Sequence, residues 1–146
     1  MERCSIKTSR FGVLEIDESR IIHFPEGLLG FPEQRRYVIL EHKPGSPFYW
    51  LQSIDSPELA FVMANPLLIK EDYLEVLAEK EKPLFESESG GDIAVFSLVT
   101  IPQGNVERMT VNLIGPLVID VDAKTGKQVI LSESGYDYRH PLMEHP

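Results

Sequence analysis

The chain has 146 residues, of which 42% are hydrophobic and 25% are charged. These values are ordinary for a soluble globular protein, and the length suits a single domain, residues 1–146, whose core needs no disulfide or metal. The formal net charge of −9 argues against direct nucleic-acid binding, because phosphate contacts require lysine and arginine.

Cys4 is the only cysteine, so we expect neither an internal disulfide nor a cysteine-based metal site. The opening sequence MERCSIKTSRFG lacks the apolar core of a secretory signal. No apolar run approaches the roughly 20 residues that span a bilayer. We therefore expect a cytoplasmic protein that binds neither a membrane nor a nucleic acid.

The first half of the chain alternates apolar and polar residues, a pattern that predicts strands. The sequence PEGLLGFPE interrupts it at 25–33, where two prolines and two glycines favour a structured turn whose apolar residues enter the core. The strands expected before position 70 lie at 5–8 and 12–16, which form an opening hairpin, and at 20–24, 37–40, 48–54 and 59–64.

Residues 71–92 carry most of the net charge. They contain eight Asp or Glu and two Lys, a net charge of −6, which leaves −3 for the other 124 residues. The spacing of Tyr73, Val76, Leu77 and Lys80 follows one face of a helix, so we expect a helix over 71–80. Pro83 ends the pattern, and an acidic loop over 86–92 follows.

Further strands are expected at 93–101, 109–114, 117–121 and 128–131, with a polar hairpin connection at 122–127. Both faces of residues 59–64 are apolar, which is typical of strands that lie between two layers or inside a barrel. The fold class is therefore all-β: a compact β-barrel or packed sheet pair of about nine or ten strands with one peripheral acidic helix.

The sequence contains none of the motifs that support common enzyme chemistry. No two of its four histidines have the i, i+4 spacing of a helical zinc site. It has no GxSxG elbow and no glycine-rich phosphate loop. We expect no catalytic residue, no cofactor and no metal, and hence a binding protein instead of an enzyme.

Several motifs follow one another in order over nearly the whole chain. They are GLLGFPE (27–33), SPFYWLQSIDSPELAFVMANP (46–66), TVNLIGPLVID (110–120), GKQVIL (126–131) and YDYRHPL (136–142). The block LQSIDSPELAF followed by ANP is the most specific of these. Together these motifs resemble the flagellar assembly factor FliW family.

This resemblance implies a small, cytoplasmic, all-β protein without enzymatic activity. It also implies two alternative partners: flagellin, and the RNA-binding translational regulator CsrA. In the family, the bound protein prevents CsrA from repressing flagellin translation, and newly made flagellin takes the protein away from CsrA. We expect a monomer when no partner is bound.

The acidic segment suggests how CsrA would be antagonised. A surface that binds RNA must be basic, and clustered acids would either compete for it or repel the phosphate backbone from beside it. Screening limits such repulsion to about 8 Å at 0.15 M salt. The candidate residues for this contact are Glu71, Asp72, Glu75, Glu79, Glu86 and Glu88.

Flagellin would need a different surface, because an amphipathic helix presents an apolar stripe that calls for an apolar groove or patch. The candidates are those of Leu28, Leu29, Phe31, Phe48 and Tyr49 that prove to be exposed.

Two other interpretations remain open. One is a small-ligand-binding β-barrel with Tyr49 and Trp50 lining its pocket. The other is an export chaperone for flagellin alone. Each set of candidates also has a simpler explanation. The acidic segment could serve only solubility, and the apolar residues could only fill the core.

Overall fold

Strands dominate the computed structural model, which describes residues 2–75, 77, 79–87, 90–102 and 105–142. Short 3-10 helices interrupt them, including η1 (Glu18–Arg20), η2 (Pro66–Leu68), η3 (Lys82–Phe85) and η5 (Val106–Arg108). The strands are β1 (Arg3–Thr8), β2 (Gly12–Asp17), β3 (Ile22–His23), β4 (Arg36–Glu41), β5 (Phe48–Ser53), β6 (Ala60–Ala64), β7 (Ile93–Thr100), β8 (Thr110–Val111), β9 (Leu117–Asp120), β10 (Thr125–Gln128) and β11 (His140–Pro141).

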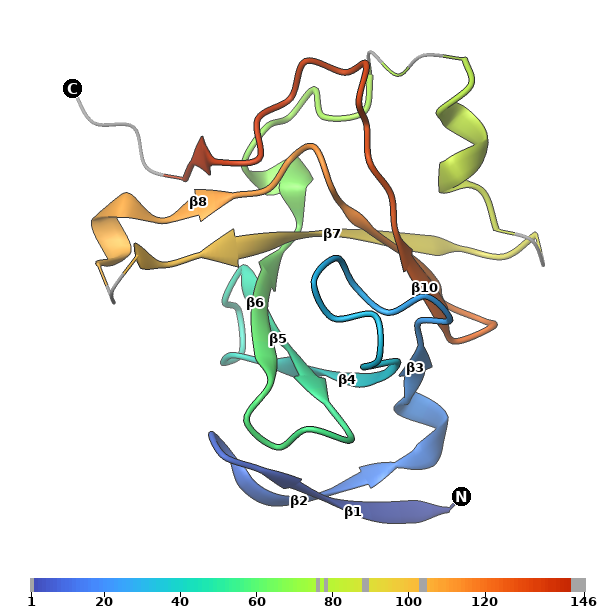
Figure 1. Cartoon of the computed structure of the whole chain (residues 1–146), viewed down its shortest axis with the longest axis vertical. Coiled ribbons are helices and arrows are strands. Elements are labelled where there is room, and N and C mark those ends of the chain that lie inside the picture. The colour runs from blue at the N-terminus through green and yellow to red at the C-terminus, as the bar shows by residue number, and fades with distance from the viewer. Residues whose placement is uncertain (1, 76, 78, 88–89, 103–104, 143–146) are drawn as a thin grey trace.

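Seven of these strands close into a barrel, in the order β7, β6, β5, β4, β3, β10, β9 and back to β7 (Figure 1). All neighbours in the ring are antiparallel except β3 and β10, which are parallel and pair through a single residue pair, His23 with Thr125. β8 and β11 extend the sheet beyond the ring along β7. The predicted all-β barrel is confirmed.

Successive side chains of the ring strands point alternately into the barrel and away from it, so they contribute to two separate cores. On β7, Ala94, Phe96 and Leu98 point into the barrel, where they pack with Tyr37, Leu51 and Met63. Alternate residues of the same strand, Ile93, Val95 and Val99, face outward. They pack in a second cluster with apolar residues from the stretches that precede β7 and follow β10. Both faces of β7 are therefore covered, as expected for strands that lie between two layers.

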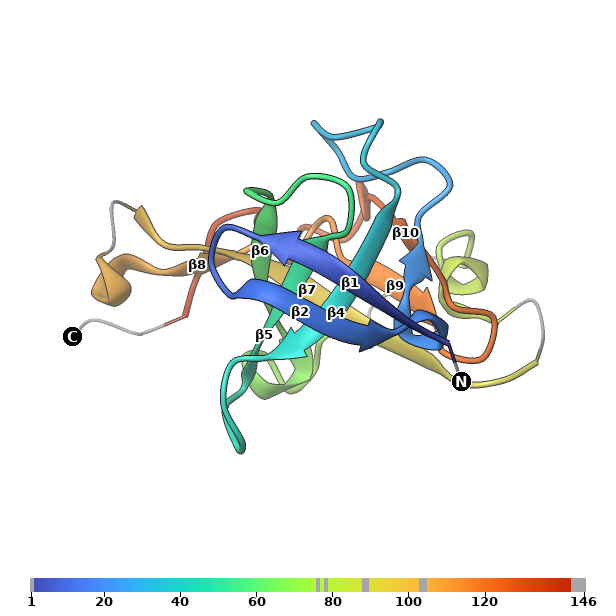
Figure 2. The same cartoon turned by 90° about the horizontal axis from the view of Figure 1, so that it is seen from below.

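The β1–β2 hairpin forms a separate two-stranded sheet that packs on the outside of the ring (Figure 2). Its inner face supplies Ile6 and Ile16, which pack against Ile21 and Val38. The Ser9 backbone N–H also donates to the Pro57 carbonyl at 2.8 Å and ties the hairpin tip to the β5–β6 connection. The predicted opening hairpin is confirmed.

The predicted helix over 71–80 is wrong in the part of that range that the structure describes. Residues 71–75, 79 and 80 form turns, and the next regular element is η3. Leu74 has a φ of +74°, a left-handed conformation that no right-handed helix contains. Val76 lies outside the described residues. A helical spacing of apolar residues therefore did not produce a helix here.

The strand expected at 128–131 begins earlier, at Thr125, and β10 ends at Gln128. The connection to β9 is correspondingly shorter than the predicted 122–127. Beyond β10 the chain still donates to the 114–116 turn, from Val129 N–H to Pro116 at 3.0 Å and from Leu131 N–H to Ile114 at 2.8 Å. The apolar run QVIL predicts a strand, but Val129 and Leu131 are buried in the outer core beyond the end of β10.

Gly126, on the closing strand β10, lies directly against the Phe24 ring. A methyl group on Gly126 would stand 2.6 Å from the Phe24 ring, so the Gly126→Ala variant must displace a fully buried side chain. We expect a loss of about 1–3 kcal/mol in the free energy of unfolding, measured by urea denaturation. Thr125→Ala, at the exposed neighbouring position, is the control. Equal stability of the two variants would contradict the tight closure.

Candidate partner-binding surface

The turn at 25–33 is a rigid loop that its own hydrogen bonds hold in place. Phe31 N–H donates to the Leu28 carbonyl at 2.7 Å, and Gly27 N–H donates to the Phe24 carbonyl at 2.9 Å. Gly27 has a φ of +66°, and a Cβ there would meet the Phe31 carbonyl oxygen at 2.4 Å. Only glycine fits this position, which explains why the loop contains it.

The three apolar residues of the loop divide into one anchor and two surface groups. Leu28 is only 3% exposed and packs in the barrel core. Leu29 is 65% exposed, and Phe31 is 39% exposed with its ring edge-on to Phe61 at 5.3 Å. Leu28 therefore fixes the loop, whereas Leu29 and Phe31 remain available to a partner. The expectation that all three enter the core holds only for Leu28.

The other two apolar candidates lie on β5. Tyr49 is half-buried against the barrel core, with its ring 5.5 Å from that of Phe96. Phe48 is also half-buried, at the start of the strand. Trp50 packs against Phe11 at 5.6 Å, and the Arg10 guanidinium lies 4.5 Å from its ring centroid.

Buried tyrosines hold the acidic segment against the outer core. Tyr73 is 2% exposed, and its hydroxyl donates to the Leu113 carbonyl at 2.5 Å. Burial raises the pKa of Tyr73 far above its ordinary value, so this proton stays in place. The Tyr136 ring lies 4.7 Å away, and its hydroxyl accepts from the Leu74 N–H at 2.9 Å. These contacts replace the helix with an irregular but anchored segment.

Four candidate acids of this segment point into solvent, whereas Glu81 is buried. Glu71, Asp72, Glu75 and Glu79 are all exposed. Asp72 pairs with Lys70 at 3.1 Å and Glu79 with Lys82 at 2.7 Å. The hydrogen bond from Lys70 lowers the pKa of Asp72, which keeps that carboxylate ionised. Exposed pairs of this kind are weak, so the carboxylates remain available to a competing cation.

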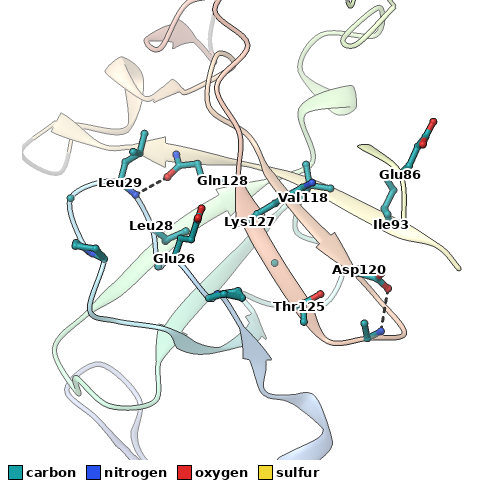
Figure 3. A pocket seen from close by; sticks show the side chains of 16 residues that line it. Glu26, Leu28, Leu29, Glu86, Ile93, Val118, Asp120, Thr125, Lys127 and Gln128 are labelled. Atoms are coloured by element: carbon teal, nitrogen blue, oxygen red, sulfur yellow. Dashed lines mark hydrogen bonds between the residues drawn. The ribbon is translucent and has the colours of Figure 1, made fainter. Parts of the chain in front are cut away.

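A cleft of about 870 Å³ is lined by two of the apolar candidates and one of the acidic candidates (Figure 3). One wall is the 25–32 loop, with Leu28 and Leu29, and the floor is the β9–β10 hairpin. Glu86, which belongs to the acidic segment, and Ile93 lie on the other side. Glu88, the remaining acidic candidate, lies outside the described residues.

Sequence reasoning missed the cleft floor, which includes Val118, Asp120, Lys127 and Gln128. The Gln128 side chain joins floor and wall, because its Oε1 accepts from the Leu29 N–H at 2.9 Å (Figure 3). Its Nε2 donates to the Gly115 carbonyl at 2.9 Å. Lys127 and Gln128 are adjacent in GKQVIL, between Gly126 and Val129, so they do not follow the alternation of a half-buried strand. No local pattern therefore marked them as cleft residues.

Glu71, Asp72, Glu75 and Glu79 do not line this cleft, and neither do Phe31, Phe48 and Tyr49. The structure thus brings together Leu28, Leu29 and Glu86 of the predicted residues. Among the described residues, no group of three or more His, Cys, Asp or Glu could hold a metal ion. No helix in the described ranges combines the length and apolar character needed to cross a membrane.

Comparison with known proteins identifies the family. The profile described as FliW protein matches residues 5–142. The chain belongs to the FliW family of flagellar assembly factors. It is 38% identical over 137 residues to the flagellar assembly factor FliW of Natranaerobius thermophilus, covering 94% of this chain and 91% of that relative. The FliW of Magnetococcus marinus is 39% identical over 94% of this chain and 84% of its own length.

A solved structure agrees with this assignment. The crystal structure of a flagellar assembly factor FliW superposes with a TM-score of 0.81 at 33% sequence identity, covering 97% of this chain and 98% of that one. The barrel described above is therefore a FliW barrel, with the 25–33 loop and the β9–β10 hairpin included in the shared length. Flagellar assembly is a non-enzymatic role that requires protein partners.

Proposed function

We propose that this protein is a cytoplasmic binding protein that holds either flagellin or the translational regulator CsrA. When it holds CsrA, it prevents CsrA from repressing flagellin translation. Flagellin binding releases CsrA, so that the synthesis of flagellin follows its export. The protein acts without catalysis, and it is a monomer when it has no partner.

The observation that supports this proposal best is the cleft, which Leu29 borders from the 25–32 loop and Glu86 borders from the acidic segment. Glu26 also lies on the loop side, and Ile93 lies beside Glu86. Leu29 stands exposed at one side and Glu86 at the other. Partners of opposite character, one apolar and one basic, would approach from the two sides of a single depression. Occupation of either side then restricts access to the other, which is the requirement for alternative binding.

The acidic segment suits CsrA because an RNA-binding surface is basic. Four exposed acids over 71–79 lie on a segment that Tyr73 and Tyr136 anchor to the body of the protein. An anchored array of charge loses less conformational entropy on binding than a mobile one. To repel RNA, these acids must lie within about 8 Å of its phosphate backbone in the complex.

The exposed apolar residues are the proposed binding surface for flagellin. A helix that has not yet assembled presents an apolar stripe, and Leu29 and Phe31 form a small apolar group on a loop that cannot collapse into the core. Phe48 remains a candidate because it is only half-buried. Tyr49, by contrast, packs into the barrel core, so its substitution would disturb the fold before it tested binding.

The charge hypothesis predicts the effect of a fourfold neutralisation. Replacing Glu71, Glu75 and Glu79 with Gln and Asp72 with Asn should weaken the displacement of RNA from CsrA. At about 0.5 kcal/mol for each exposed contact, the combined loss is about 2 kcal/mol, or roughly thirtyfold. Competition of the protein with labelled RNA for CsrA at 0.15 M salt measures this.

A matched control separates position from net charge. Gln at Glu15, Glu18, Glu41 and Glu58, all exposed, brings the net charge to the same −5, four units above −9. This control should displace RNA as the native protein does. Equal displacement by the two variants would remove the acidic segment from the CsrA contact.

The apolar hypothesis predicts that Leu29→Arg and Phe31→Arg each weaken flagellin capture. A buried Leu or Phe contributes about 1.5–3 kcal/mol, so each variant should lose roughly tenfold or more in affinity by calorimetric titration. Val13→Arg is the control, since Val13 is 68% exposed on the β1–β2 hairpin. Circular dichroism should show all variants folded. Undiminished capture by Leu29→Arg, Phe31→Arg and Phe48→Arg would exclude this surface.

A further inference from the structure

A second cavity, of about 280 Å³, opens at the mouth of the barrel and has a different chemistry from the cleft. Six apolar side chains line it, and the only other lining residues are two cations, Arg20 and Lys124. The apolar lining consists of Ile22, Ile39, Ala94, Phe96, Ile119 and Val121. No acid borders the cavity, although the chain carries a net charge of −9.

The apolar lining belongs to the ring core. Ile22 lies on β3, Ile39 on β4, Ala94 and Phe96 on β7, and Ile119 on β9. Ile22 and Ile119 are buried, but Ile39, Ala94 and Phe96 are only partly buried on the inward face of their strands. The small Ala94 stands opposite Ile119 across the β7–β9 pair. The barrel interior is therefore incompletely filled at this end.

Backbone contacts place both cations at the rim. Arg20 is the last residue of η1, which directly follows Asp17. The Asp17 carboxylate accepts hydrogen bonds from the Ser19 N–H at 2.9 Å and from the Ser19 hydroxyl at 2.8 Å. Lys124 has a φ of +57°, and its carbonyl accepts from the His23 N–H at 2.9 Å in the contact that closes the ring. A left-handed lysine is uncommon, which indicates that the position is fixed by its surroundings.

Neither cation forms an ion pair with a carboxylate among the described residues. The pKa of Asp17 is lowered mainly by its hydrogen bonds from Ser19 and, to a lesser extent, by the charge of Arg20. The Lys124 Nζ donates to the Val121 carbonyl at 2.9 Å, which turns the ammonium group back toward the hairpin and leaves it further donors. Two cations beside an apolar cavity form a complementary site for an anion that carries an apolar group.

We propose that this barrel-mouth cavity binds a small apolar group that ends in a carboxylate, with the apolar group among the isoleucines and the carboxylate between Arg20 and Lys124. The volume suits one aliphatic side chain or a short acyl chain. This chemistry has two sources: a free short-chain carboxylic acid, or the C-terminal residue of a protein chain. The site is separate from the flagellin and CsrA surfaces proposed above and does not depend on them.

Isoleucine methyl NMR of the full chain tests the proposal. The probes are hexanoate and the peptide acetyl-Ala-Ala-Leu, each compared with its uncharged amide. The methyl signals of Ile22, Ile39 and Ile119 should shift saturably with a carboxylate probe, and those of Ile6 and Ile16 in the hairpin core should not. Saturation by hexanoate alone assigns a free acid, and saturation by the peptide assigns a chain terminus.

Variants distinguish the charge from the cavity. Arg20→Gln and Lys124→Asn, which retains a residue that tolerates positive φ, should each weaken binding about tenfold, as expected for a lost charged hydrogen bond. Lys127→Gln, on the same hairpin but bordering the other cleft, should leave binding unchanged. Ala94→Leu should abolish it by filling the cavity.

Two results would overturn the proposal. One is the absence of saturable shifts at Ile22, Ile39 and Ile119 with both carboxylate probes at millimolar concentration. The other is equal binding of the amides and the carboxylates, which would remove any role for the two cations. Loss of folding in Ala94→Leu leaves both tests intact, because the two cation variants alter only exposed or half-buried side chains at the rim.

Discussion

The closure of the ring at β10 is the constraint on which the rest of the structure depends. The antiparallel sheet is completed by one parallel pair, His23 with Thr125, and the next residue on β10, Gly126, lies against the Phe24 ring. Because no side chain stands at Gly126, Phe24 enters the core completely. The chain then turns into the 25–33 loop, and Leu28 anchors that loop beside Phe24. A barrel that did not close here would have neither the wall nor the floor of the cleft.

As a consequence, the two candidate surfaces are attached to the same closed barrel. The loop that exposes Leu29 and Phe31 begins at the closure, and the β9–β10 hairpin leads to the side where Glu86 borders the cleft. The acidic segment is joined to the same body through the outer core, by Tyr73 and Tyr136. If the proposed partners bind these two surfaces, they approach the same barrel, and competition for space is the simplest way for one to exclude the other.

The sequence predicted most of the strands because alternation and short apolar runs are local signals. It failed where long-range contacts override local pattern. Tyr73 has the spacing of a helical face, yet its hydroxyl reaches Leu113, and Leu74 takes a left-handed conformation to donate to Tyr136. Val129 and Leu131 resemble a strand because they enter the outer core. The cleft could not be predicted, since Gln128 and Leu29 meet across 99 positions. Leu28 and Leu29 are identical in type, and only the loop geometry decides which is buried.

The most direct test of alternative binding is to add purified flagellin to the preformed complex of this protein with CsrA and to determine the masses of the products by size-exclusion chromatography with light scattering. The account predicts that flagellin releases CsrA, that only complexes with one kind of partner are present, and that the released CsrA binds RNA again. A stable complex that contains all three proteins would contradict mutually exclusive binding. Capture of flagellin with no complex formed with CsrA at the outset would contradict the regulatory role and leave a chaperone for flagellin alone.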